Sequence, residues 1–254
     1  MKISIITVSY NSIKFIESCI MSVKNQSYDD IEHIIVDGAS NDGTLSLLSS
    51  MRNNFSTLVS EPDKGIYDAM NKGIQLAKGD VIGFLNSDDF YNNDKIIFKV
   101  ANLFKNESLL DCCYADLIYT SKLDIAKNIR YWKSNNFYPG LFSKGWCPPH
   151  QTFFVRRSVY EKYGSFNLDY NIASDVELMM RFLEVYKINF RYVPEVWIKM
   201  RLGGTTNKNL KNIYKQNIEI LNALKFHGLT ANWFYFSLNK IISRFLQFLR
   251  KSDK

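Results

Sequence analysis

Acidic side chains follow three apolar segments that have the composition of buried β-strands. Asp37, Asp63 and the adjacent pair Asp88 and Asp89 each come shortly after one of these segments. Ligands of open α/β sheets bind beyond the carboxyl ends of the strands, so we expect these acids at one shared edge. A single acid such as Asp37 is as easily a turn or cap residue, but three acidic strand ends in one cleft indicate a ligand.

The absence of two phosphate-binding motifs limits how a phosphorylated ligand could bind. No G-x-G-x-x-G follows the first apolar segment, and G-x-x-x-x-G-K-[ST] does not occur, so no glycine-rich phosphate cradle is expected. Carboxylates repel a bare diphosphate, but their oxygens bind Mg²⁺ or Mn²⁺, and the metal then binds phosphate oxygens. Asp88 and Asp89 are the predicted metal site, the alternative being an acidic pair in a solvated turn. Asp37 can accept a hydrogen bond from a nucleobase, and Tyr10 can stack on its ring.

The elements that carry these residues alternate between strand and helix patterns. Apolar strand segments at 3–8, 32–36, 55–60 and 81–85 are separated by segments with helical spacing of apolar residues. This order predicts an α/β fold with a mostly parallel, Rossmann-like sheet and helices on both faces.

Composition limits the class of protein. The 254 residues are 46% apolar and 22% charged, which excludes a disordered, collagen-like or coiled-coil chain. The four cysteines include no C-x₂-C pair, so no zinc or redox site of that type is expected. Neither a signal peptide nor an apolar run of ~20 residues is found, and we therefore expect a cytoplasmic protein with reduced thiols.

The formal net charge of +7 is concentrated in the C-terminal segment. Residues 206–254 hold nine basic and two acidic side chains, and apolar residues recur there at helical spacing. This pattern predicts a basic amphipathic helical tail. Residues 230–251 fit peripheral contact with an anionic membrane, for example the inner face of the cell membrane, but a helix packed on the body or on a second subunit fits equally well. No nucleic-acid recognition motif is present.

Four motifs together resemble one known family. They are Ile5–Asn11, the run D-G-A-S-N-D-G-T at 37–44, Gly65–Gly73, and Asn86–Asp89. Residues 1–205 resemble a family 2 glycosyltransferase with the GT-A fold, of the kind that acts in bacterial surface-polysaccharide assembly. The resemblance implies inverting transfer of a sugar from a nucleotide-diphosphate sugar, with uridine as the favoured base and Mn²⁺ or Mg²⁺ bound.

The resemblance also assigns residues to the donor and its metal. Thr7, Tyr10 and Asp37 would contact base and ribose, Asp63 would lie near the base, Asp88 would hold ribose or sugar, and Asp89 would bind the metal. Two positions depart from the family pattern. Asn86 stands where many members have an acid. Met70 stands where many have an arginine, so Lys72 or another cation is expected to serve near the phosphates.

The second half of the chain supplies the predicted catalytic base. Asp175, within Ala173–Leu178, aligns with the family's catalytic carboxylate. By position alone Asp175 is a candidate N-cap for the helical pattern at 176–185. His150, in a proline-rich loop, is either a contact to acceptor, diphosphate or metal, or a structural histidine.

These assignments divide the chain into a nucleotide-sugar-binding half (1–110), an acceptor-binding and catalytic half (111–205) and the tail (206–254). The Q-x-x-R-W signature of processive synthases is absent, which favours transfer of one hexosyl or N-acetylhexosaminyl unit to a glycan or lipid-linked glycan. Two alternatives are a sugar nucleotidyltransferase, whose glycine-rich basic loop is missing, and a non-catalytic nucleotide-sugar-binding protein.

Overall fold

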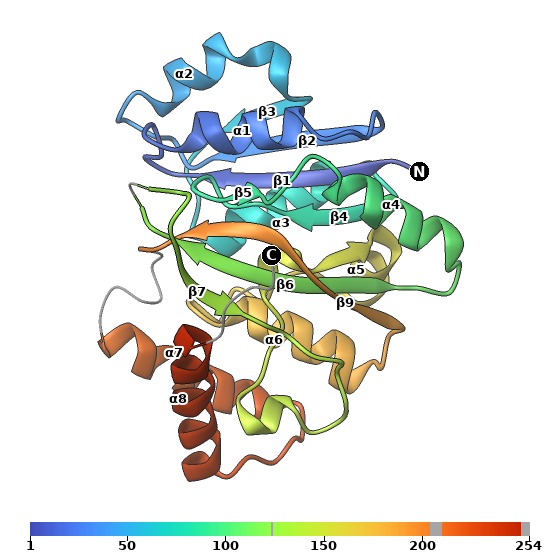
Figure 1. Cartoon of the computed structure of the whole chain (residues 1–254), viewed down its shortest axis with the longest axis vertical. Coiled ribbons are helices and arrows are strands. Elements are labelled where there is room, and N and C mark those ends of the chain that lie inside the picture. The colour runs from blue at the N-terminus through green and yellow to red at the C-terminus, as the bar shows by residue number, and fades with distance from the viewer. Residues whose placement is uncertain (123, 204–209, 250–254) are drawn as a thin grey trace.

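The computed structural model describes residues 1–122, 124–203 and 210–249. A single nine-stranded sheet curls through the molecule in the order β3-β2-β1-β4-β8-β6-β9-β5, with β7 paired to β6 (Figure 1). The strands are β1 (Ile3–Ser9), β2 (Ile31–Asp37), β3 (Thr57–Ser60), β4 (Val81–Phe84), β5 (Phe90–Tyr91), β6 (Cys112–Thr120), β7 (Asn128–Trp132), β8 (Phe154–Arg156) and β9 (Phe190–Arg201).

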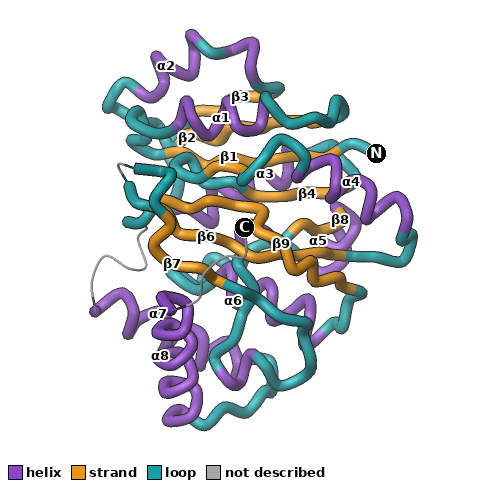
Figure 2. The backbone as a smooth tube through the Cα atoms, in the orientation of Figure 1, coloured by secondary structure: helices purple, strands orange, loops and turns teal. Residues whose placement is uncertain are grey.

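Helices cover both faces of this sheet (Figure 2). They are α1 (Ile16–Lys24), α2 (Thr44–Ser50), α3 (Ile66–Leu76), α4 (Ile96–Asn106), α5 (Arg157–Tyr163), α6 (Ser174–Met180), α7 (Leu210–Phe226) and α8 (Trp233–Leu249). A π-helical turn, Arg181–Val185, continues α6. The predicted strands at 3–8, 32–36, 55–60 and 81–85 are therefore confirmed as β1 to β4, and so is the α/β class.

Strand β1 shows how the sheet separates two layers of the core. All seven of its residues are buried, because successive side chains point to opposite faces. Ile3 and Ile5 pack with α1 and α4, whereas Ile6 and Val8 pack with α3 and α6. Strands β3, β2, β1 and β4 are mutually parallel, so their carboxyl ends meet at one edge as the sequence predicts.

The second half extends the same sheet with mixed pairing. Strand β8 lies antiparallel to both β4 and β6, and thereby joins residues 1–110 to residues 111–205. Strand β6 is buried along its whole length, parallel to β9 and antiparallel to β7. Strand β9 ends near β5, which brings its last residue, Arg201, to the loop that follows β4.

The tail forms two helices that pack beside β7 and α6 (Figure 1). Ile220, Ala223, Leu224 and Phe236 are buried in the core of the body. Residues 206–209 and 250–254 of the predicted tail lie outside the described residues. Among the helices that the structure describes, none is long and apolar enough to cross a membrane.

Candidate active site

The ends of β1, β2 and β3 bring Tyr10, Gly38 and Asp63 together. A Cβ atom added at Gly38 would lie 2.4 Å from Asp63 Oδ2 and 3.4 Å from Tyr10 Cδ2. The ring of Tyr10 is 64% exposed, and Asp63 is held by a 2.8 Å hydrogen bond from the Gly65 amide to its Oδ1. The edge thus presents an open aromatic face beside a fixed carboxylate, as stacking and hydrogen bonding to a nucleobase require.

Asp37 ends β2 beneath this group and is fully buried. Its carboxylate accepts hydrogen bonds from the Ser40 amide at 2.9 Å, from Ser40 Oγ at 2.5 Å and from Ser60 Oγ at 2.8 Å. An ionised carboxylate has about four acceptor sites, so the protein itself satisfies most of those of Asp37.

Thr7 does not reach the same group, although its position in β1 is as predicted. Its side chain is fully buried on the α1 face, 3.0 Å from His33 Nε2 and 3.7 Å from Cys19 Sγ. Burial lowers the pKa of His33 to about 3, so this imidazole is neutral. The alternation of side chains along β1 directs Thr7 away from the opening that Tyr10 faces.

Lys72 lies on α3, where its ammonium group already forms ion pairs with protein carboxylates. Its Nζ forms ion pairs with Glu61 at 2.7 Å and Asp68 at 3.8 Å, and donates to the Pro62 carbonyl at 2.9 Å. These carboxylates raise the pKa of Lys72, the hydrogen bond to Glu61 most strongly. A phosphate would have to replace Glu61 to recruit this lysine.

The loop after β4 carries the predicted metal site. Asp89 is fully buried, and its Oδ2 receives one long hydrogen bond of 3.3 Å from Asn86 Nδ2. Asp89 Oδ1 and Asn86 Oδ1 have no partner in the part of the chain that the structure describes. Burial, followed by the charge of Asp88, raises the pKa of Asp89 well above its ordinary value.

Burial also raises the pKa of Asp88. Within residues 1–122, 124–203 and 210–249, no three histidines, cysteines or acids converge as a metal-binding group. Any cation here would therefore rely on Asp89, the neighbouring oxygens of this loop and oxygens brought by a ligand.

Arg201 fixes this loop from the far end of β9, a contact that the sequence pattern does not reveal. Its Nη1 donates to the Asp88 carbonyl at 2.5 Å, and its Nη2 donates to Ser18 Oγ at 3.1 Å. The guanidinium lies over the rings of Phe15 and Phe90, 5.1 and 4.9 Å from their centroids. The contact joins residues 113 positions apart, so only tertiary packing creates it.

Asp175 lies in the first turn of α6, but it is not the N-cap. The N-cap is Ala173, and no side chain in the described structure caps it. The Asp175 carboxylate instead accepts a 2.9 Å hydrogen bond from the Tyr67 hydroxyl of α3. Burial and the charge of Asp175 raise the pKa of Tyr67, so the phenol stays protonated and donates. Sequence reasoning did not identify Tyr67, which lies 108 residues away.

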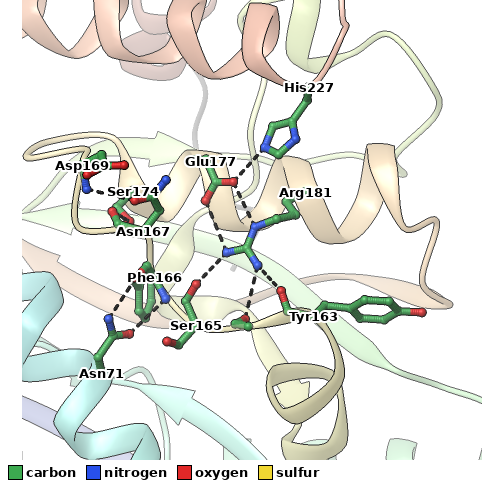
Figure 3. Close-up of polar contacts among 11 residues, drawn as sticks. Asn71, Tyr163, Ser165, Phe166, Asn167, Asp169, Ser174, Glu177, Arg181 and His227 are labelled. Carbon is green, nitrogen blue, oxygen red and sulfur yellow. Dashed lines mark hydrogen bonds and ion pairs between the residues drawn. The ribbon is translucent and has the colours of Figure 1, made fainter.

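A buried polar network holds α6 in place (Figure 3). Glu177 accepts a 2.9 Å hydrogen bond from Arg181 Nε and lies 2.8 Å from His227 Nε2, beyond α7. Arg181 also donates to the carbonyls of Tyr163 and Ser165. Since Asp175 and Glu177 share the first turns of α6, this network fixes the helix that carries Asp175.

Two further contacts complete that support. Asn71 of α3 exchanges two 2.9 Å hydrogen bonds with the backbone of Phe166 (Figure 3). Glu219 of α7 accepts from the amides of Ile172 and Ala173 at 2.8 and 3.0 Å, just before α6. Asp175 is therefore held from α3, α6 and α7 together.

His150 is buried beside this carboxylate. Its ring stacks on Phe84, with centroids 5.3 Å apart, and meets Phe166 edge to face at 5.6 Å. Burial lowers the pKa of His150, partly opposed by the charge of Asp175, so the ring is neutral. A neutral imidazole packed between two aromatic rings fits the structural alternative, although its proximity to Asp175 keeps it at the site.

The family model described as "Glycosyl transferase family 2" matches residues 4–164 of this chain. The match spans more than half of the sequence and contains β1 to β4, the edge with Tyr10, Gly38 and Asp63, and the Asp88–Asp89 loop. The chain belongs to glycosyltransferase family 2. The resemblance inferred from the four motifs is thereby confirmed, and of the three enzyme or binding classes considered, glycosyltransferase is the one supported.

Curated relatives of this family 2 glycosyltransferase include two from mycobacteria. An uncharacterised glycosyltransferase of Mycobacterium tuberculosis is 32% identical over 181 residues, covering 70% of this chain and 68% of the relative. A PGL/p-HBAD biosynthesis glycosyltransferase of Mycobacterium bovis is 29% identical over 208 residues, covering 80% of this chain and 78% of the relative.

Solved structures show that this glycosyltransferase has the GT-A fold. S. aureus TarS in complex with UDP-GlcNAc matches 88% of this chain and 72% of the other, with a TM-score of 0.65 and 17% identity. The mannosyltransferase PcManGT from Pyrobaculum calidifontis, in complex with GDP-Man and Mn²⁺, matches 94% and 73%, with a TM-score of 0.63 and 16% identity.

Proposed function

We infer that this glycosyltransferase moves one sugar from a nucleotide-diphosphate sugar, preferably a UDP-sugar, to a glycan or lipid-linked glycan with inversion at the anomeric carbon. The observation that carries the proposal is the buried Asp89, whose Oδ1 has no described partner at the carboxyl end of β4. A buried carboxylate without a partner is costly unless a ligand compensates it. The complexes of TarS with UDP-GlcNAc and of PcManGT with GDP-Man and Mn²⁺ support a nucleotide-sugar donor and a metal.

The oxygens around Asp89 suit a hard divalent cation. Asp89 Oδ1 and Asn86 Oδ1 are both buried and without a described partner, and Asp88 adds a second carboxylate. Bound there, Mg²⁺ or Mn²⁺ would offset the negative charge on the departing diphosphate. Arg201 keeps this loop in position through the Asp88 carbonyl.

The nucleoside is assigned to the open edge formed by Tyr10, Asp37 and Asp63. Tyr10 offers an exposed ring for stacking, and Asp63 lies against Gly38 beside it. Asp37 is rigid because Ser40 and Ser60 hold it, which suits a residue that must discriminate hydrogen-bond donors of the base or ribose.

Asp175 is assigned as the general base. Tyr67 holds its Oδ1 and orients the carboxyl group. The proton of the acceptor hydroxyl passes to Asp175 as the acceptor oxygen forms a bond to the anomeric carbon. The bond from that carbon to the diphosphate oxygen breaks in the same step, and a single displacement inverts the configuration.

The test combines donor binding with donor hydrolysis. Nucleoside diphosphates and their sugars are screened for stabilisation of the full chain with and without Mn²⁺, since a ligand that binds only the folded state raises its melting temperature. We expect metal-dependent stabilisation by one nucleotide class and slow hydrolysis of its sugar in the absence of acceptor. Folded protein that responds to no nucleotide and hydrolyses none would contradict the proposal.

Helix α8 supports peripheral membrane contact as part of this function. Its exposed apolar side chains, here called the outer face of α8, are Trp233, Phe234, Tyr235, Leu238, Ile241, Ile242, Phe245, Leu246, Phe248 and Leu249. The helix does pack on the body, but mainly through Phe236 and Gln247, so its apolar surface stays uncovered. An uncovered apolar face on a basic segment fits an anionic membrane surface.

Vesicle flotation tests this contact. The double variant Ile241→Ser/Phe245→Ser should float less with vesicles containing anionic lipid than the unmodified chain does, because it removes apolar surface from the outer face of α8. The control is Phe98→Ser, at an exposed apolar position on α4. Equal flotation of all three proteins, or none by any, contradicts membrane contact.

A further inference from the structure

Three cations of β7 and α8 lie along one side of α8. They are Arg130, Lys240 and Arg244, here called the basic cluster. Lys240 and Arg244 are one helical turn apart, and Arg130 of β7 lies against Phe248, one turn further along. The charge of Arg244 contributes to lowering the pKa of both Arg130 and Lys240, although burial is the larger cause in each case. None of the three forms an ion pair with a carboxylate in the described part of the chain.

Arg130 is the most enclosed member of the basic cluster. It is only 9% exposed, and its guanidinium carbon lies 3.9 Å from the centroid of the Tyr119 ring and 5.8 Å from that of Phe248. Its Nε is buried and has no described hydrogen-bond partner. A buried cation is unfavourable unless an anion and hydrogen-bond acceptors compensate it. Aromatic faces supply only part of that compensation.

Lys240 is held by neutral groups. Its Nζ donates to Asn217 Oδ1 of α7 at 2.8 Å and lies 5.3 Å from the centroid of the Phe236 ring. Gly145 allows the close approach of α8, because an added Cβ would lie 2.6 Å from Lys240 Cγ and 2.9 Å from the Phe236 carbonyl. Lys240 and the buried Phe236 thus face the body, whereas most apolar side chains of α8 remain exposed.

The charges of two proposed site carboxylates reach the surroundings of the basic cluster. Burial and Arg244 lower the pKa of Lys240, whereas Cys147 and Asp175 contribute to raising it. Burial and Asp89 contribute to raising the pKa of Tyr119, whereas Arg130 and Arg244 contribute to lowering it.

We propose that Arg130, Lys240 and Arg244 form a phosphate-binding subsite that takes a phosphate or diphosphate ester of one of the two substrates. The inference deepens the proposed function and rests on it. Planar guanidinium groups and a lysine ammonium match the oxygens of such esters. The ester has two possible sources, the diphosphate of the donor and the diphosphate of a lipid-linked acceptor. In the second case the outer face of α8 would meet the lipid surface directly behind the cluster.

Inorganic pyrophosphate probes the subsite directly. Its binding to the full chain is measured by calorimetry with EDTA present, so that a cation at Asp89 does not contribute. We expect Arg130→Gln/Lys240→Gln to weaken binding at least tenfold. The matched control, Lys211→Gln/Lys225→Gln, removes the same charge from exposed positions of α7 and should bind as the unmodified chain does. Because Arg130 is packed in the interior, the less buried Arg244→Gln is measured as well, and circular dichroism verifies folding.

Two further ligands identify the source of the ester. If UDP binding in Mn²⁺ falls in the cluster variants, the subsite holds the donor. If UDP binding is retained while a short prenyl diphosphate in detergent micelles binds more weakly, the subsite holds the acceptor.

Unchanged binding of pyrophosphate, UDP and prenyl diphosphate by the folded cluster variants overturns the inference, and so does an equal loss in the α7 control. These results are separable from failure of the proposed function. An unmodified chain that binds and hydrolyses a nucleotide sugar, with cluster variants that bind all three probes normally, removes the subsite and leaves the function standing.

Discussion

Asp37 and Asp89 are both fully buried carboxylates at the carboxyl ends of parallel strands, yet their surroundings are opposite. Asp37 accepts three hydrogen bonds of 2.5 to 2.9 Å from Ser40 and Ser60. Among the described residues, the Asp89 carboxylate receives a 3.3 Å bond from the side chain of Asn86, and its Oδ1 has no hydrogen-bond partner. Burial and Asp88 raise the pKa of Asp89 and outweigh the backbone and the charge of Arg201, which lower it. The protein therefore compensates the carboxylate of Asp37 with three hydrogen bonds and that of Asp89 only in part.

The same contrast separates larger regions. The edge built from β1, β2 and β3 holds its buried carboxylate, Asp37, through hydrogen bonds within the protein. Arg130 of β7 and Lys240 of α8, in contrast, form no ion pair with a carboxylate among the described residues. Removing a satisfied group should therefore reduce folding stability, whereas removing an uncompensated one should reduce activity and leave the fold intact.

The largest effect is expected at Asp175. Asp175→Asn removes the proposed base and should reduce sugar transfer by about 10²–10⁴-fold, with donor affinity unchanged. Initial rates and donor binding by calorimetry measure the two effects. The control is Asp169→Asn, an exposed acid near the same helix. Near-normal turnover by Asp175→Asn would show that Asp175 is not the general base.

Asp89→Asn should reduce transfer by about 10²–10³-fold and abolish the stabilisation by Mn²⁺ with nucleotide. Its melting temperature without ligand should be unchanged or higher, because the substitution removes a buried and poorly compensated carboxylate. Differential scanning fluorimetry in EDTA provides this comparison. If Asp89→Asn is much less stable than the unmodified chain in the absence of ligand, Asp89 stabilises the fold as Asp37 does, and the contrast between the two carboxylates is wrong.

Asp37→Asn should instead lower the free energy of unfolding by roughly 1–3 kcal/mol, because an amide cannot accept all three hydrogen bonds and leaves a buried donor unpaired. Chemical denaturation measures the change. Ser60→Ala, which removes one of the three donors, should cost about 1 kcal/mol. If Asp37→Asn is as stable as the unmodified chain, the hydrogen bonds around Asp37 contribute less than the structure indicates.

Tyr67→Phe should have the smallest effect. It removes one hydrogen bond worth about 1 kcal/mol, so the loss in kcat should be roughly fivefold, with donor affinity retained. Because Tyr67 acts through Asp175, the variant should have no additional effect in the Asp175→Asn background. Equal losses in both backgrounds would show that Tyr67 acts independently of Asp175.

Local patterns in the sequence predicted much of the fold and which side chains meet at the edge of the sheet. Three local features carried these predictions: the mostly apolar run of β1, the turn residues after β2 and the acids after three strands. The parallel order of β1 to β4 then follows from the alternation of strands and helices, and so does the meeting of Tyr10, Asp37 and Asp63 at one edge. The family motifs lie within these same elements.

Only the tertiary structure determined which polar and charged side chains have hydrogen-bond or ion-pair partners. Thr7 belongs to a strand-end motif, but the pleat of β1 turns it to His33 and away from the opening. Asp175 has the sequence position of a helix cap, yet it pairs with Tyr67, because α3 packs across the start of α6. The spacing of apolar residues in α8 predicts a helix, but spacing cannot state which face packs inward. The close approach of α8 at Gly145 brings Lys240 against the body. The groups that contact a charged side chain such as Lys240 come from elements distant in the chain, and no local pattern specifies how those elements pack.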